Sequence, residues 1–295
     1  MEIHLKRAEK RLAVGAIASP FVSWSTTLTR ATLGKMLIDF EPPEQDARYP
    51  WKEPAAACVS VDFDVTTPGR EGPNRTGTFA LLELSEKYEI PLTWAICGRT
   101  AVEDPRSYAR ILDSTARQEI GVHTYSHVDA SKTGADELEA EIRRCIEVLG
   151  LSAQPRTFVF PWNMEAHFDL LKKMGFTAYR GRSRAIGGLS KARGLWNIPP
   201  VYYVDQKSVG AASLMKRYVD LCLMHRAVYH LWTHPWSLVM EGGSAERMIK
   251  TALEPVFEHM SKKRDEGLLH VATMGGLADA LELSVERTPA ALAPN

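Results

Sequence analysis

From residue 55 onward, short apolar runs alternate with longer segments in which apolar residues recur every three or four positions. Short apolar runs are typical of buried strands, and the longer spacing is typical of helices with one buried face. The strands predicted in this way are 56–61, 92–97, 120–123, 157–160, 178–179, 201–203, 227–232 and 268–272. The predicted helices are 76–88, 105–117, 136–149, 166–174, 213–225 and 245–265.

This repeated alternation predicts an α/β fold with a parallel sheet. Polar residues suited to chemistry recur at the carboxyl ends of the strands, which favours a closed or distorted barrel over an open sheet. We expect three parts: an N-terminal extension over residues 1–52, a single barrel domain over 53–285 and a C-terminal tail over 286–295. The Pro-rich, charged stretch 41–46 indicates a loop or linker near the end of the extension.

The charge balance and the cysteines limit the classes of partner and compartment. The 295 residues include 36 Lys and Arg and 36 Asp and Glu, so the formal net charge is +0. This balance offers no electrostatic reason to expect nucleic acid or an anionic membrane as a partner. Cys58, Cys97, Cys145 and Cys222 form no C-x-x-C pair and mostly lie in apolar stretches. We therefore expect free, buried thiols in a reducing compartment.

The N-terminal segment raises the question of targeting. No charged residue occurs between Arg11 and Arg30, and the apolar run 12–18 follows a basic start, as in a weak secretory or anchor sequence. Serine, threonine and proline residues over 19–29 interrupt the run, so it falls short of a membrane span. We expect a cytoplasmic protein with an N-terminal arm packed on the barrel; anchoring or export through this segment is the alternative.

Four residues form a candidate metal site. His123 and His127 are four residues apart, and on a helical turn this spacing places both imidazoles on one face. Asp62 and Asp64 follow the apolar run 55–61 at strand spacing, so their side chains point the same way. Two imidazoles and a carboxylate with open coordination positions are the ligand set of a catalytic divalent metal. Surface histidines with aspartates that cap a loop are the alternative interpretation.

A candidate substrate platform follows the predicted strand 157–160. Pro161, Trp162 and Asn163 would place a rigid ring and a flat indole at the edge of the sheet. Trp faces commonly stack on the apolar faces of sugar rings. A Trp that covers the core is the alternative.

A second candidate stretch surrounds the end of the predicted strand 227–232. His234 falls at the end of this strand, where an imidazole is suited to proton transfer near neutral pH. Trp236 follows it and is a candidate substrate-binding residue. His225 and His230 are interpreted as structural.

Taken together, the Asp-x-Asp at 62–64, the His-Thr-Tyr-Ser-His at 123–127, the Pro-Trp loop at 161–162 and the strand-end His234 resemble the polysaccharide deacetylase (NodB-homology, carbohydrate esterase family 4-like) family. The resemblance covers roughly residues 55 to 280. It implies a distorted (β/α)7 barrel and metal-dependent removal of an N- or O-acetyl group from a sugar. It further implies that His123, His127 and Asp64 bind the metal, that Asp62 is the general base and that His234 is the acid.

The chain departs from the usual family pattern at three places. The family's aspartates are usually adjacent, whereas Phe63 separates them here, so the base and ligand assignments of Asp62 and Asp64 could be exchanged. Val159 stands where the family's groove motif has an arginine that orients the base, so Asp62 must be held in another way. Asn163 stands where Gly is frequent.

Three arginines at alternate positions follow, Arg180, Arg182 and Arg184. On an extended segment, alternate positions present their side chains on one side. The arginines therefore form either a solvated basic loop or a clamp for an anionic substrate group such as phosphate or uronate, which suits bidentate recognition by guanidinium.

The ligand set and the family resemblance together lead to one main hypothesis and two alternatives. Zinc fits two imidazoles and a carboxylate, and cobalt, nickel or iron fit as well. The main hypothesis is a metal-dependent hydrolase acting on an acetylated sugar or saccharide precursor, in which a metal-activated water attacks the acyl carbon. The alternatives are a deformylase or amidase that acts on a lipid-linked or non-sugar amide, and a barrel that binds carbohydrate without catalysis.

Overall fold

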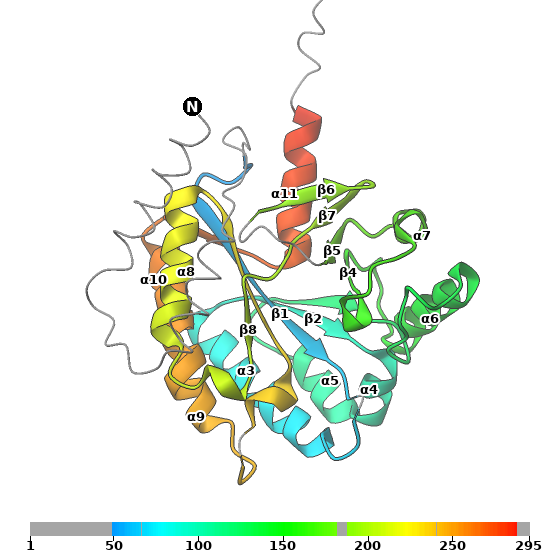
Figure 1. Cartoon of the computed structure of the whole chain (residues 1–295), viewed down its shortest axis with the longest axis horizontal. Helices are drawn as coiled ribbons and strands as arrows, with labels where there is room; N and C mark the ends of the chain where they lie inside the picture. The colour runs from blue at the N-terminus through cyan, green and yellow to red at the C-terminus, as the bar shows by residue number, and fades with distance from the viewer. Residues whose placement is uncertain (1–48, 66, 182–187, 240, 288–295) are drawn as a thin grey trace, which may run out of the picture. The chain divides into compact units, whose positions relative to one another are not determined.

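The structure is a computed structural model that describes residues 49–65, 67–181, 188–239 and 241–287. One sheet runs through these residues in the order β6-β7-β5-β4-β3-β2-β1-β9-β8, with β10 beside β1 (Figure 1). All strand pairs are parallel except β6 with β7. The strands are β1 Ala55–Phe63, β2 Leu92–Ile96, β3 Gln118–Val122, β4 Thr157–Val159, β5 Ala178–Arg180, β6 Ser190–Ala192, β7 Leu195–Asn197, β8 Tyr202–Val204, β9 Val228–Thr233 and β10 Leu269–Val271.

Helices pack around the outside of this sheet (Figure 1). The α-helices are α3 Glu71–Tyr88, α4 Gly98–Glu103, α5 Pro105–Leu112, α6 Ala135–Val148, α7 Phe168–Lys173, α8 Ala212–His225, α9 Glu246–Met248, α10 Glu254–Asp265 and α11 Met274–Arg287. A π-helical turn, Ile249–Leu253, joins α9 to α10, and the short 3-10 helices are η1 Pro161–Asn163, η2 Gln206–Ser208 and η3 Pro235–Leu238.

The central strand is β1, which pairs with β2, β9 and β10. All nine of its residues are buried, as expected for a parallel strand covered on both faces. Because parallel strands end at the same edge of a sheet, the carboxyl ends of β1, β2, β3 and β9 meet at one rim. Asp62 and Asp64 lie at this end of β1 and are therefore delivered to the rim of the core.

The predicted α/β barrel is confirmed in a distorted form. The sheet curls into a half-barrel, and its end strands β6 and β8 are not paired with each other in the described residues. The antiparallel hairpin β6–β7 and the helices α4 and α11 were not predicted. Helix α5 ends at Leu112 rather than at residue 117, since Asp113 leaves helical geometry.

The described thiols agree with the sequence expectation, since Cys58, Cys97, Cys145 and Cys222 are all free and buried. Among the described residues no helix is long and apolar enough to cross a membrane. The apolar run 12–18 lies outside the described residues, so the expected location of the protein stays a prediction.

The first described residues pack against the base of the sheet. Tyr49 stacks on Trp51 with ring centroids 4.7 Å apart, and Trp51 stacks on His270 of β10 at 5.5 Å. Trp51 joins a core cluster with Ala56 and Cys58 of β1. The predicted division at residues 52 and 285 stays a prediction, because most of the extension and of the tail lies outside the described residues.

Candidate metal centre and active site

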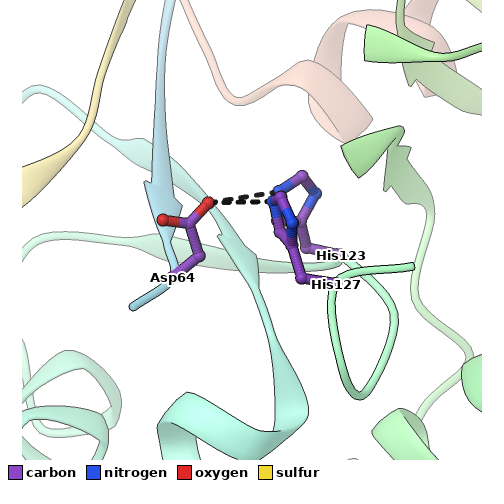
Figure 2. A group of neighbouring side chains, drawn as sticks. All are labelled: Asp64, His123 and His127. Carbon is purple, nitrogen blue, oxygen red and sulfur yellow. Dashed lines mark ion pairs between the residues drawn. The ribbon is translucent and has the colours of Figure 1, made fainter. Parts of the chain in front are cut away.

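Asp64, His123 and His127 meet at the rim where β1 and β3 end. The Nε2 atoms of His127 and His123 lie 3.1 and 3.6 Å from Oδ2 of Asp64. Figure 2 shows the carboxylate of Asp64 facing both imidazole rings. All three side chains are buried. Their ligand atoms lie within 4.8 Å of one another, which is close enough to share one metal ion.

The two histidines converge through a tight loop, so the predicted helical turn is wrong. No helix forms over residues 123–127, and Thr124 and His127 have positive φ angles of 59° and 62°. The loop is held from outside by Glu141 of α6, whose carboxylate accepts hydrogen bonds from the backbone N–H and the hydroxyl of Ser126. Left-handed residues in a non-glycine loop cost free energy and often occur at functional sites.

The donor atoms at this site fit a divalent metal. Nδ1 of His123 lies 2.8 Å from the carbonyl oxygen of Val159 and must donate to it, since a carbonyl only accepts. This fixes the tautomer with a lone pair on Nε2, which is buried and has no hydrogen-bond partner. Tetrahedral coordination with bonds of ~2.1 Å separates ligand atoms by about 3.4 Å, which is close to the two measured distances to Asp64.

The protonation states of Asp64 and His127 also suit coordination. Burial alone raises the pKa of Asp64, but the imidazoles of His123 and His127, which face its carboxylate, and the nearby His234 hold it well below its usual value. Burial lowers the pKa of His127, against the opposing effect of Asp64. An ionised carboxylate and a neutral imidazole are the forms that bind a metal.

Asp62 is held by a buried arginine. Both Nη atoms of Arg180 donate to the two carboxylate oxygens of Asp62 at 2.5 Å, and Nη1 also donates to Oγ of Ser60 at 3.1 Å. Arg180 is 1% exposed, and its guanidinium stacks over the ring of Trp232 at 4.2 Å. Burial raises the pKa of Asp62, but the charge and hydrogen bonds of Arg180 bring it below the usual value, so the carboxylate is ionised.

The expected role of Arg180 in a substrate clamp is therefore corrected. Its guanidinium is buried and already occupied by Asp62, so it is not available to an anionic substrate group. Arg182 and Arg184 lie outside the described residues, and the clamp stays a prediction for them alone.

His234 follows β9 directly and faces both aspartates. Its Nε2 lies 3.7 Å from Oδ2 of Asp62 and 3.7 Å from Oδ2 of Asp64. On the other side of the ring, Nδ1 is hydrogen-bonded to the hydroxyl of Tyr203 in β8 at 3.2 Å. Burial lowers the pKa of His234 despite the two carboxylates, so the ring is neutral at neutral pH. Tyr203 thus orients the ring without adding a charge.

Trp236 contacts the candidate metal ligand directly. Its indole Nε1 donates to Oδ1 of Asp64 at 3.2 Å, which leaves Oδ2 facing the histidines. The guanidinium of Arg70 lies 3.6 Å over the indole ring. One stacking position on Trp236 is therefore already occupied, while its hydrogen bond orients Asp64.

The predicted platform lies at the mouth of the site. Trp162 in η1 is 58% exposed. The centroids of its ring and of the His127 ring lie 4.8 Å apart, in a T-shaped contact. Trp162 and Asn163 both have positive φ angles, 57° and 54°, so the turn projects the indole outward at a conformational cost. Pro161 is buried beneath them. More than half of the Trp162 side chain is therefore accessible to solvent.

Comparison with known proteins agrees with this geometry. The family model for polysaccharide deacetylase matches residues 52–178, which include Asp62, Asp64, His123 and His127. The predicted resemblance to the polysaccharide deacetylase family is confirmed. The enzymes of this family are hydrolases of carbon–nitrogen bonds other than peptide bonds, and the chain is assigned to that class.

Solved structures show the same fold as this chain. A Mycobacterium smegmatis protein assigned as a polysaccharide deacetylase is 18% identical, with a TM-score of 0.63 over 86% of this chain and 99% of its own. A Pseudomonas aeruginosa PAO1 protein with the same assignment is 14% identical, with a TM-score of 0.60 over 83% of this chain and 96% of its own. The likeness extends past residue 178 and so includes the later strands of the half-barrel.

The sequence reasoning missed three contributors to this site. Ser60 lies two residues before Asp62 on β1, so strand periodicity alone places it on the same side. Tyr203 and Arg70 come from segments that carry no motif, and only the fold brings them to His234 and Trp236.

Proposed function

We propose that this protein is a metal-dependent hydrolase that removes an N-acetyl or O-acetyl group from a sugar or saccharide precursor. The observation that carries the proposal is the meeting of Asp64, His123 and His127 with Asp62 and His234 at one buried rim. The match to the polysaccharide deacetylase family model supports the same reaction class.

Asp64, His123 and His127 would hold the cation. Asp64 would bind through Oδ2, and His123 and His127 through Nε2. Zinc suits this donor set, and cobalt, nickel and iron suit it as well. A divalent cation bound there supplies a Lewis acid and makes a water molecule in the site more acidic.

Asp62 is the proposed general base. Arg180 keeps its carboxylate ionised, and Oδ2 lies 3.7 Å from Nε2 of His234. A base in this position accepts the proton of the attacking water as the bond to the acyl carbon forms. Asp64 faces both histidines, whereas Asp62 is paired with Arg180. These contacts support Asp62 as the base and Asp64 as the metal ligand rather than the reverse.

His234 is the proposed acid. An amine leaves poorly as an anion, so a proton must reach the nitrogen as the carbon–nitrogen bond breaks. Nε2 of His234 lies 3.7 Å from the Asp62 oxygen that takes up the proton from water, so the neutral ring can receive that proton from Asp62 and deliver it to the leaving nitrogen. Trp162 is the proposed platform for the sugar ring, with Pro161 and Asn163 shaping the turn that carries it.

The test compares the full chain loaded with zinc, stripped with a chelator, and reloaded. Substrates are N-acetylated and O-acetylated saccharides, with matched N-formyl and non-sugar amides, and the products are acetate, formate and free amine. We expect the zinc-loaded chain to release acetate from the sugars, the chelated chain to release none, and the reloaded chain to recover the activity. The His123→Ala variant should release no acetate. Release of formate alone would show that the acyl group is formyl rather than acetyl, and acetate release that survives chelation would refute the metal dependence.

A further inference from the structure

Behind Asp62 a chain of hydrogen bonds runs through the core and away from the rim. Nη1 of Arg180 contacts Oγ of Ser60 at 3.1 Å, and Oγ of Ser60 lies 2.8 Å from Nε2 of His230. Nδ1 of His230 lies 2.8 Å from the carbonyl oxygen of Ile198. Ser60 and His230 are 0% exposed, so water does not compete for these contacts.

With His230 neutral, the chemistry of the four groups permits only one arrangement of protons. The carbonyl of Ile198 only accepts, so Nδ1 of His230 carries a hydrogen. The guanidinium only donates, so Oγ of Ser60 accepts from Arg180. The hydroxyl hydrogen of Ser60 then points to Nε2 of His230, which accepts it as part of a neutral ring.

A protonated His230 would break this order. Its Nε2–H would donate to Oγ of Ser60, so the hydroxyl hydrogen of Ser60 would lose its acceptor, and two cations would lie close together in the core. Burial lowers the pKa of His230 to about 3, with the charge of Arg180 acting in the same direction, which agrees with the neutral ring.

We propose that Ser60 and His230 are positioning residues for the general base, and that they act by fixing the guanidinium of Arg180 against Asp62. This inference rests on the proposed function. Nε of Arg180 is buried and has no hydrogen-bond partner among the described residues. Apart from Asp62 itself, the guanidinium is therefore held by the hydroxyl of Ser60 and the ring of Trp232.

The arrangement also accounts for a departure in the sequence. Val159 occupies the place where the resemblance implies a base-orienting arginine, and Arg180 reaches Asp62 from β5 instead. An arginine that approaches from a different strand needs its own support. Ser60 of β1 and His230 of β9 supply that support, because β1 and β9 are adjacent and parallel.

The experiment measures kcat, KM and zinc affinity on the substrate that the wild type turns over. Ser60→Ala removes the hydroxyl, and His230→Asn keeps a donor for Ile198 but loses the acceptor for Ser60. We expect each to lower kcat about 10- to 100-fold, as for losses of groups that orient active-site residues, while KM and zinc affinity stay within about twofold. Ser60→Thr, which keeps the hydroxyl, is expected to restore kcat.

Two controls separate positioning from general damage to the core. Cys58→Ala truncates another buried β1 side chain two residues earlier and is expected to retain the wild-type kcat. In an Arg180→Met background, Ser60→Ala is expected to lower kcat no further, because Ser60 acts through Arg180. Wild-type kcat in Ser60→Ala, or losses that multiply in the double variant, would overturn the inference.

A crystal structure of Ser60→Ala tests the inference without an assay. We expect the Arg180 guanidinium to leave its two-point contact with Asp62. A guanidinium that keeps both contacts would overturn the positioning role even if the protein proved active. If the wild type released no acyl group, the proposed function would fail, while this structure would still decide whether Ser60 holds Arg180.

Discussion

At the scale of single residues, the site depends on how each charged group is oriented by a neighbour. Asp62 is oriented by Arg180, Asp64 by Trp236, His123 by the carbonyl of Val159, and His234 by Tyr203. Such partners determine the tautomer, the ionisation and the direction of the reactive atoms. Each can be tested separately from the groups that would bind the metal.

Replacing Arg180 should change the pH dependence of hydrolysis. The arginine lowers the pKa of Asp62, so the base is ionised down to acidic pH and activity is lost only when pH falls through that lowered pKa. Arg180→Met should raise the pKa of Asp62, because the adjacent positive charge and its hydrogen bonds favour the ionised carboxylate. The acidic limb of kcat/KM against pH should therefore move to higher pH.

Arg180→Lys is the matched control, because it retains the positive charge without the two-point contact. Its acidic limb should lie between those of the wild type and Arg180→Met. Identical acidic limbs in the wild type and Arg180→Met would show that another group is the base.

Replacing Trp236 should weaken metal binding. Trp236→Phe keeps an aromatic ring but removes the N–H that donates to Asp64. Loss of such an orienting contact typically lowers metal affinity about 10- to 100-fold. Zinc affinity can be measured by competition with a chromophoric chelator.

Trp196→Phe is the matched control, because it removes the same kind of hydrogen bond elsewhere in the fold. In the wild type, the indole Nε1 of Trp196 donates to Glu282. Trp196→Phe should bind zinc as the wild type does. Equal affinities in both variants would mean that the hydrogen bond to Asp64 has no effect on coordination.

At the scale of elements, helix α3 and the short helix η3 pack very closely, and η3 carries Trp236 next to His234. A Cβ on Gly77 of α3 would lie 2.0 Å from the backbone oxygen of Pro235. Backbone cannot move aside as a flexible side chain can. This glycine therefore allows the helix to approach the segment that carries part of the site.

Gly77→Ala should push η3 away from α3 and destabilise the fold by about 1 to 3 kcal/mol, the usual cost of overpacking. Gly72 lies on the same helix with open space around its Cβ position. Gly72→Ala should be neutral or stabilising by up to about 1 kcal/mol, as Ala is the better helix former. Urea unfolding of the two variants measures the difference, and equal stabilities would refute the close packing.

At the scale of the whole molecule, the buried His230 should make folding sensitive to acid. Its pKa is about 3 in the folded protein, whereas an unfolded histidine titrates near its ordinary 6.5. Below that value the unfolded chain binds a proton that the folded protein does not. Stability is therefore lost as pH falls from 6.5 toward 3, at no more than about 1.4 kcal/mol per pH unit.

At pH 5 this linkage amounts to about 2 kcal/mol relative to neutral pH. His230→Asn removes the titrating ring, so its unfolding free energy should decline less steeply between pH 7 and 5 than that of the wild type. The two slopes are compared rather than the two stabilities, because the substitution changes the absolute value as well. Parallel slopes would show that His230 is protonated in the folded protein.

The local pattern of the sequence was sufficient for the elements that carry the site. Continuous apolar runs predicted the buried strands β1, β2 and β9, and the two-residue period placed Asp62 and Asp64 on one side of β1. These signals are local, since strand periodicity depends on neighbouring residues alone. The hairpin β6–β7 lacked such a signal, because β6 has no buried apolar run and β7 is only three residues long.

Spacing alone was misleading where backbone geometry was irregular. The four-residue interval of His123 and His127 suggested a helical turn, but left-handed residues in a loop bring the two rings together. The alternating arginines suggested one surface, but Arg180 lies in β5 and turns into the core toward Asp62. A side chain of this length can reach across the sheet, and the sequence does not specify which partner it meets.

The sequence by itself determined which residue types were available at the ends of the strands, and therefore the class of chemistry. Only the tertiary structure decided which partner holds each of them: Arg180 for Asp62, Trp236 for Asp64, and Tyr203 for His234. The reason is physical. Strand and helix periods arise from contacts between near neighbours. The orientation of these buried groups depends on partners 31 to 172 residues away, which only the curled sheet brings within hydrogen-bonding distance.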